Sequence, residues 1–471
     1  MTRSSSGFFR DNIEAFAVAI AMALVIRHFC LEAFRIPTGS MRPTLLGDEM
    51  LSTGERLHGD RILVDKFVYL RRDPRRYEVI VFRYPLNANK NFIKRLIGLP
   101  SEWLRVADGD VWTSTDEGET WGIARKPAGV REQLMIPYYP EPAGHPEGFA
   151  GKNNWRPEEG WSVDEAKRVF RVDAGAEETA LTFARQVLGY DDYDSGGYRH
   201  EPQDLVGDVQ VRFEVEVARA GALEVGIRER GTLHRLVLSA DKSVAIVGGA
   251  DPHEVDLGVA LEVGERHEVS FQNVDDTLVV SIDGEESVIE FPNARTEPPD
   301  AVEIRVGSNA GDNAIVFSAR AMKATLFDVS VARDVHYASR RSDNQVWKIP
   351  AGHYFVLGDN TQSSKDSREW YVAEAKLKDG RVVRWEGGGD AREPGNPHTV
   401  PYGEPEEVVT IWRDVDGIVR RFKVGDVASD DTHVAYSFVP RSHLIGRAFS
   451  VFWPIFVPPV YTGPSRVKMI R

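Results

Sequence analysis

Cysteine is nearly absent from this chain of 471 residues: Cys30 is the only one, so no disulfide can form within the chain. The sequence also lacks a recognisable metal-ligand spacing, a P-loop and a glycine fingerprint for dinucleotides. We therefore expect neither a metal nor a cofactor, although the acidic run Asp191–Asp194 leaves a calcium loop open as an alternative. The histidines give no convincing Ser-His-Asp order along the chain, so a serine nucleophile would need a base other than histidine.

Charge is unevenly spread along the chain. Hydrophobic residues make up 42% and charged residues 28%, which is typical of globular domains and argues against disorder. The net charge is −14, yet residues 1–105 hold 17 Lys and Arg against 11 Asp and Glu, so the acidic excess lies in the remainder. An acidic main part argues against nucleic acid as a partner, whereas a basic N-terminal part is compatible with a membrane surface.

Long apolar runs are also scarce. Ala15–Ile26 is an unbroken apolar stretch of twelve residues, whereas a membrane span needs about 20. The span can extend over Ile13–Phe34 if its charged residues lie near the membrane interfaces. No small-x-small cleavage site follows it. We expect an N-terminal transmembrane helix, with a cleaved signal peptide or a buried soluble helix as the alternatives.

A rigid turn follows this segment. Pro37 and Pro43 restrict the backbone on either side of Ser40, and Gly39 permits a tight turn directly before it. Such a turn could present the Ser40 hydroxyl at a fixed angle, with a second hydroxyl from Thr38 nearby. From these residues alone, an ordinary Thr-Gly-Ser turn is the competing interpretation.

A lysine in a strand is the candidate base. Residues 79–84 and 91–98 are typical of two strands joined by a loop around residues 87–90. Side chains alternate along a strand, so Phe92, Lys94 and Leu96 share one face. Apolar neighbours would desolvate the Lys94 amine and lower its pKa from about 10.4 toward neutrality. The alternative is an edge-strand charge that faces solvent.

Six segments, taken together and in order, resemble the bacterial type I signal peptidase family. Each would be weak alone, and with the apolar segment they cover under a fifth of the chain. They are residues 36–45, 59–69, 77–85, 92–102, 358–368 and 438–448. The resemblance implies that Ser40 is the nucleophile and Lys94 the general base. It also implies that Thr38 and the Ser40 backbone N–H form an oxyanion hole.

The resemblance assigns supporting roles as well. Ser364 would orient the lysine amine, and Asp366 and Arg368 would form an ion pair that shapes the site. The turn at Asp359 and Asn360 would support the catalytic residues. Shallow pockets for small substrate side chains would be lined by Phe34, Ile36 and Ile93.

The implied function is that of a serine endopeptidase (signal peptidase I) in the cytoplasmic membrane, single-pass, with its catalytic domain on the extracytoplasmic side. It would remove signal peptides from secretory preproteins by a Ser-Lys dyad, cutting after small residues of the Ala-x-Ala type. Its partners would be preproteins and the lipid bilayer. The alternative function is a catalytically weak membrane scaffold whose inserted domain binds a glycan or a partner protein.

The inserted domain is predicted from short alternating segments. Between about residues 208 and 331 they recur every 8–12 residues, which indicates a β-sandwich with an unknown ligand. This pattern faintly resembles sandwiches of the concanavalin and laminin-G type. We expect a helix near Val163–Leu188 and a mainly β protein with an antiparallel β catalytic core. The expected segments are a membrane anchor (1–34), a catalytic core in three parts (35–137, 346–370 and 436–471), an inserted region (138–345) and a second insertion (371–435).

Overall fold

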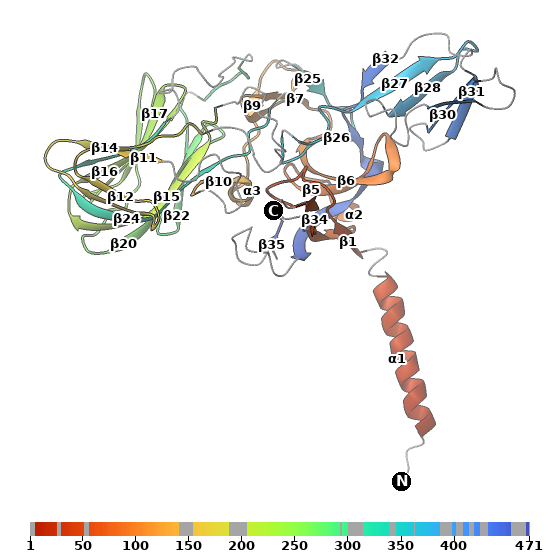
Figure 1. Ribbon diagram of the computed structural model, residues 1–471, viewed down its shortest axis with the longest axis horizontal. Coiled ribbons are helices and arrows are strands. Elements are labelled where there is room, and N and C mark those ends of the chain that lie inside the picture. Colours follow the sequence, from red (N-terminus) through yellow and green to blue (C-terminus); the bar gives the residue numbers. More distant parts are fainter. Residues whose placement is uncertain are drawn as a thin grey trace. The chain divides into compact units, whose positions relative to one another are not determined.

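The computed structural model describes most of the chain, and it is mainly β, as predicted (Figure 1). The chain forms two compact units. Within the described residues, one consists of those before 103 and after 347, and the other of those from 103 to 347. The second unit starts before residue 138, where we expected the inserted region to begin. The described residues are 5–25, 30–50, 56–140, 154–187, 205–292, 294–299, 314–338, 345–361, 363–386, 398–401, 408–413, 419–423, 432–453 and 468–470.

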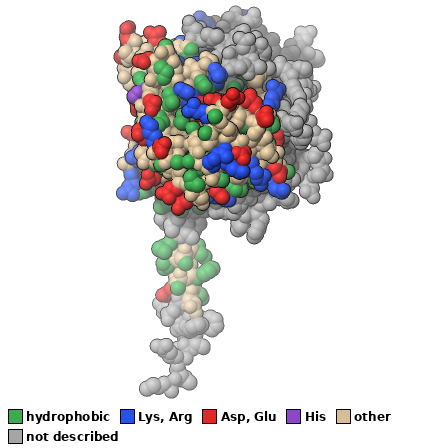
Figure 2. All heavy atoms as spheres, turned by 90° about the vertical axis from the view of Figure 1, so that its left-hand side faces the viewer, with side chains coloured by type: hydrophobic (Ala, Val, Ile, Leu, Met, Phe, Trp, Pro, Cys, Tyr) green, Lys and Arg blue, Asp and Glu red, His purple; other side chains and the backbone are tan. Residues whose placement is uncertain are grey.

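Helix α1 (Ser5–Val25) contains most of the N-terminal apolar stretch. Its large apolar side chains are exposed, including Ile13 at 67% and Phe16 at 69% (Figure 2). None of the helices within the described residues combines the length and hydropathy that a membrane span requires. The membrane anchor stays a prediction.

An antiparallel sheet forms the centre of the first unit, and its strands come from both ends of the chain. The order along its main path is β1, β4, β34, β5, β6, β26 and β33, with β35 paired to β34. These strands are β1 (Leu31–Arg35), β4 (Arg61–Asp65), β5 (Val79–Tyr84), β6 (Asn87–Gly98), β26 (His353–Leu357), β33 (Val439–Pro440), β34 (Leu444–Trp453) and β35 (Lys468–Met469). Two short helices accompany them, α2 (Val68–Arg71) and η4 (Arg441–His443).

The hairpin of β5 and β6 confirms the two strands expected from the sequence. The connection is shorter than expected, because residue 87 already belongs to β6 and Tyr84 lies opposite Asn87. Both faces of β5 are buried, since Ile80 and Phe82 pack into one apolar cluster and Val79 and Val81 into another. The alternation therefore fixes which residues of β6 face each cluster.

The second unit contains a β-sandwich of two antiparallel sheets. One has the order β12-β13-β24-β15-β20-β21-β22 with β10 paired to β24, and the other has the order β11-β14-β23-β16-β17-β18-β19. Their inner faces share one core, in which Phe213 and Phe317 meet with ring centroids 5.4 Å apart. The strands are β10 (Ile136–Tyr139), β11 (Trp155–Pro157), β12 (Trp161–Asp164), β13 (Val169–Asp173), β14 (Thr179–Phe183), β15 (Val209–Arg219), β16 (Ala222–Glu229), β17 (Thr232–Ser239), β18 (Val244–Val247), β19 (His253–Asp256), β20 (Arg266–Val274), β21 (Thr277–Ile282), β22 (Glu285–Glu290), β23 (Ala314–Arg320) and β24 (Lys323–Arg333).

The helix expected near Val163–Leu188 is wrong. That stretch forms strands of the sandwich, because Val169–Asp173 and Thr179–Phe183 alternate between buried and more exposed side chains. The stretch is rich in Ala, Glu and Arg, which favour a helix by propensity, and each of its strands is only four or five residues long. Trp155 on β11 packs between Phe170 and Phe183, so the sandwich extends beyond the interval 208–331 that the sequence indicated.

Smaller sheets complete the described residues. β25 (Val346–Lys348), β7 (Trp103–Ala107), β8 (Asp110–Ser114) and β9 (Gly122–Ile123) form one sheet, and α3 (Ala128–Leu134) follows in the chain. The second insertion contains β27 (Tyr371–Lys376), β28 (Val382–Glu386) and β32 (Thr432–Ala435) in one sheet and β29 (His398–Pro401), β30 (Val408–Arg413) and β31 (Val419–Lys423) in another. A two-stranded ribbon joins β2 (Glu49–Met50) and β3 (Arg56–Leu57).

Candidate active site

The Ser40 turn is fixed on both sides by backbone contacts. The N–H of Ile36 donates to the carbonyl of Asp60 at 2.9 Å, which anchors the start of the turn. Gly47 packs against the turn so closely that a β-carbon there would lie 2.2 Å from the carbonyl carbon of Thr38. Ser40 itself is buried, with 9% of its surface exposed. Its hydroxyl therefore has a defined position rather than the freedom of a surface serine.

Lys94 reaches this hydroxyl from β6. Its Nζ lies 2.5 Å from Oγ of Ser40, in a buried hydrogen bond between residues 54 positions apart. As the alternation along the strand predicted, Lys94 shares its face with Phe92 and Leu96, which pack with the same apolar cluster. The distance is short enough for direct proton transfer between the two side chains.

Burial lowers the pKa of Lys94 from its ordinary 10.5 to about 8. The apolar surroundings disfavour the ammonium form, and the nearby cation of Arg368 adds a smaller effect in the same direction. The carboxylates of Asp366 and Asp359 oppose this shift and raise the pKa. Burial prevails, so a substantial fraction of the amine is neutral in mildly basic solution and can accept the proton of Ser40.

A turn after β26 holds the Ser40 turn in place. The backbone N–H of Asn360 donates to the carbonyl of Ser40 at 3.2 Å, and its side-chain amide donates to the carbonyl of Gly39 at 3.3 Å. Gly358 allows this close approach, since a β-carbon there would lie 2.4 Å from the Ser40 carbonyl oxygen and 2.1 Å from Oγ of Ser364. The two turns thus pack together with no space for another side chain.

Asp366 and Arg368 form a buried ion pair. Nη2 of Arg368 donates to Oδ2 of Asp366 at 2.7 Å, and Nε donates to Oδ1 at 2.9 Å. The backbone N–H of Gly358 also donates to Asp366 at 3.0 Å. Burial alone would raise the pKa of Asp366, but the charge and hydrogen bonds of Arg368 outweigh it and the pKa is lowered. Asp366 therefore stays ionised and is paired with Arg368 rather than with Lys94.

A second buried ion pair was missed by the sequence analysis. Arg95 and Asp359 are fully buried and joined at 2.7 Å and 2.8 Å. Arg95 also donates to the carbonyl of Tyr77 at 2.8 Å and to the Thr44 hydroxyl at 3.2 Å, so it connects β6 to the segment after Ser40. An arginine directly before the apolar residues Leu96 and Ile97 in the strand was the available signal. Asp359 lies close to Arg95 because Leu357 pairs with Arg95 across β26 and β6. The sequence does not reveal this strand register, so the partner of Arg95 could not be deduced from it.

Neither Ser364 nor Thr38 has a described side-chain hydrogen bond to the Ser40–Lys94 pair. Ser364 is buried beside Gly358, but its hydroxyl has no hydrogen-bond partner among the described residues. The expected contact from Ser364 to the amine of Lys94 is therefore not formed in this structure. Thr38 is exposed, two residues before Ser40.

The expected pocket residues lie on one apolar cluster. Phe34 and Ile93 are half-buried and pack against it, which leaves part of each side chain accessible. Ile36 is 1% exposed and belongs to the cluster itself. Phe34 and Ile93 can thus contact a ligand directly, whereas Ile36 supports them from beneath.

The family comparison matches the segments that carry this site. The family model described as signal peptidase, peptidase S26, matches residues 9–122 and 297–385, which include Ser40, Lys94 and Asp366. Signal peptidase I of Pseudomonas fluorescens is 41% identical over 93 residues, covering 20% of this chain and 33% of the relative. Probable signal peptidase I-2 of Synechocystis sp. is 36% identical over 125 residues, covering 25% of this chain and 52% of the relative. The chain thus spans between a third and about half of the length of these two relatives.

Solved structures match the chain only weakly. A carbohydrate-binding module from Bacillus subtilis aligns with 39% of this chain and 97% of its own, at 11% identity and a TM-score of 0.25. A likeness at this score carries no argument about fold or ligand. The sequence matches are the informative ones: the segments that carry Ser40 and Lys94 match the family model of signal peptidase, peptidase S26, and the chain is similar to signal peptidase I of several bacteria.

Proposed function

We propose that this protein is a membrane-bound serine endopeptidase that removes signal peptides from secretory preproteins. Ser40 is the nucleophile and Lys94 the general base. The observation that carries the proposal is the 2.5 Å contact between Lys94 Nζ and Ser40 Oγ, made by an amine whose pKa burial lowers to about 8. A neutral amine that contacts a buried hydroxyl provides the nucleophile and base that acyl transfer requires.

The reaction follows from this contact. The neutral amine of Lys94 takes the proton of Ser40 as Oγ attacks the carbonyl of the last signal-peptide residue, and a tetrahedral oxyanion forms. The Ser40 N–H and the Thr38 hydroxyl are the proposed donors to that oxyanion. The Lys94 ammonium then protonates the leaving amine, which releases the mature protein. Water, deprotonated by Lys94, hydrolyses the acyl-enzyme.

The substrate surface supports cleavage after small residues. Phe34 and Ile93 offer shallow apolar contacts on a fully packed cluster, which leaves little depth for large side chains. β1, which carries Phe34, lies at the edge of its sheet and pairs only with β4 among the described strands. An extended cleavage region such as Ala-x-Ala would add to this edge as a further strand.

The apolar exposure of α1 supports membrane attachment. Phe16, Val18 and Met22 are each at least 60% exposed, which is unfavourable in water and favourable in a bilayer. α1 would anchor the protein in the cytoplasmic membrane, with the catalytic residues on the extracytoplasmic side, where preproteins emerge.

Replacing either member of the dyad should abolish cleavage. We expect Ser40→Ala and Lys94→Met to lower kcat by roughly 10⁴-fold or more, because each removes a group needed for acyl transfer. The measurement is the cleavage of a preprotein in detergent or lipid. Lys90→Met is the matched control, since Lys90 lies on the same strand but is exposed. Normal cleavage by folded Lys94→Met would exclude Lys94 as the base.

The rate should depend on the protonation of Lys94. Because the pKa of Lys94 is about 8 and the neutral amine is the active form, kcat/KM should rise with pH and level off above about 8. Two pH units below that pKa the amine is about 1% neutral, so kcat/KM at pH 6 should be roughly 100-fold below its plateau. The profile is measured with a preprotein between pH 5.5 and 9.5, and a flat profile would contradict the mechanism.

The close approach of Gly358 to the Ser40 carbonyl should be essential for the position of the Ser40 turn. In Gly358→Ala the added β-carbon must displace the Ser40 carbonyl, so we expect kcat to fall by roughly 10²-fold or more. Adding Ser364→Ala should not restore activity, because the clash with Ser40 remains. Gly122→Ala is the control, since its β-carbon would meet nothing within 4 Å. Full activity of Gly358→Ala would show that the two turns do not need this packing.

A further inference from the structure

A cluster of carboxylates in the second unit is not used by the proposed peptidase reaction. Asp110 begins β8, Asp208 precedes β15, and Asp275 lies in the turn between β20 and β21. Each offers a carboxylate oxygen, and these oxygens lie within 4.8 Å of one another. Three segments far apart in the sequence thus bring negative charge to one place.

The surrounding residues leave this charge uncompensated. Nη2 of Arg295 contacts Asp110 at 2.8 Å, and Lys126 pairs with both Asp275 and Asp334. Among the described residues the carboxylates still outnumber the cations near them. The acids are Asp108, Asp110, Asp208, Glu229, Asp275, Asp276 and Asp334, and the cations are Arg125, Lys126, Arg230, Arg295 and Arg333. Buried excess charge of one sign is costly unless another ion balances it.

Two carboxylate oxygens, one in this cluster and one on Asp334 beside it, have neither a hydrogen-bond partner nor an ion pair among the described residues. Oδ1 of Asp110 and Oδ1 of Asp334 are buried, and neither has such a partner within the described ranges. The residues are 4% and 2% exposed, so bulk water does not reach these atoms. Unsatisfied buried carboxylate oxygens are rare in folded proteins and point to an ion or an ordered water.

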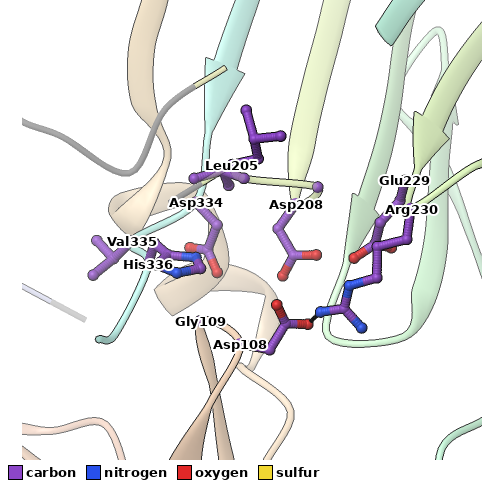
Figure 3. A pocket seen from close by; sticks show the side chains of 11 residues that line it. Asp108, Gly109, Leu205, Asp208, Glu229, Arg230, Asp334, Val335 and His336 are labelled. Carbon is purple, nitrogen blue, oxygen red and sulfur yellow. Dashed lines mark ion pairs between the residues drawn. The ribbon is translucent and has the colours of Figure 1, made fainter. Parts of the chain in front are cut away.

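A small cavity adjoins these groups. Its volume is about 10 Å³, close to the space that one water molecule or ion requires. Figure 3 shows the carboxylates of Asp208 and Asp334 directed toward the same space, with Glu229 also on the cavity wall. Gly207 leaves room beside them, since a β-carbon there would lie 2.4 Å from Glu229. The wall thus carries four acids together with Arg230 and His336, and Asp208 is the one proposed ligand that lines it.

We propose that this cluster binds one calcium ion, with Asp110, Asp208 and Asp275 as carboxylate ligands. Calcium takes oxygen ligands at about 2.3–2.6 Å, so oxygens on opposite sides of the ion lie about 5 Å apart, which matches the cluster. Asp334 is linked to the cluster, because Lys126 pairs with both Asp275 and Asp334. The ion joins the strand that Asp110 begins to two loops of the sandwich. The acidic run Asp191–Asp194, for which the sequence left a calcium loop open, lies outside the described residues.

The test uses the full chain in detergent after treatment with EGTA. Calcium should bind with a stoichiometry of one per chain in isothermal titration calorimetry. At about 100-fold excess over its dissociation constant it should raise the thermal midpoint of the wild type by roughly 5 °C or more. Asp110→Asn and Asp208→Asn should lose this rise and bind calcium at least tenfold more weakly. Glu224→Gln, a neutralised carboxylate on β16 of the same unit, should respond like the wild type.

The outcomes separate the proposal from a purely structural cluster. If the acids were only structural, the Asn variants would be stabilised by reduced repulsion, and calcium would shift no midpoint. No calcium binding by the wild type, equal binding by both Asn variants, or an equal effect of magnesium would overturn the proposal. If an Asn variant fails to fold, the calcium titration of the wild type still tests whether the protein binds one calcium ion per chain. Preprotein cleavage is measured separately, so failure of the proposed peptidase function is a distinguishable result.

Discussion

The contact between Lys94 Nζ and Ser40 Oγ requires an amine that is buried and yet free of its proton. Burial alone favours the neutral amine, but Asp366 and Asp359 lie near enough to raise its pKa again. Each of these acids has its own arginine, Arg368 for Asp366 and Arg95 for Asp359. The two ion pairs thus allow carboxylates to organise the turns around the dyad while leaving the lysine pKa near 8.

The two units differ in how their buried carboxylates are balanced by cations. Around Ser40, acids and arginines form pairs at hydrogen-bonding distance, so the site needs no outside ion for balance. In the second unit the acids outnumber the cations, and Asp110 and Asp334 keep oxygens without hydrogen-bond partners among the described residues. The proposed calcium ion would balance this excess of acids, and its binding does not depend on the peptidase chemistry.

Local patterns in the sequence predicted local geometry well. Alternation along residues 91–98 predicted the face that Lys94 shares with Phe92 and Leu96, because a strand has a fixed period. The pairing of Arg95 with Asp359 could not be predicted, because it joins residues 264 positions apart through the register of β6 and β26. The carboxylate cluster could not be predicted either, because Asp110, Asp208 and Asp275 are far apart in the sequence. The helix expected near Val163–Leu188 was wrong because tertiary packing in the sandwich outweighed the helix propensity of its Ala, Glu and Arg residues.

The central claim is that Lys94 carries a lowered pKa because it is buried beside Ser40. The most direct measurement follows the NMR signal of the Lys94 side chain from pH 6 to 11 in the full chain, assigned by comparison with Lys94→Met. The account predicts a titration midpoint near 8, well below the exposed lysines. A midpoint above 10 would mean that the amine is solvated and charged at working pH, and it would contradict the account.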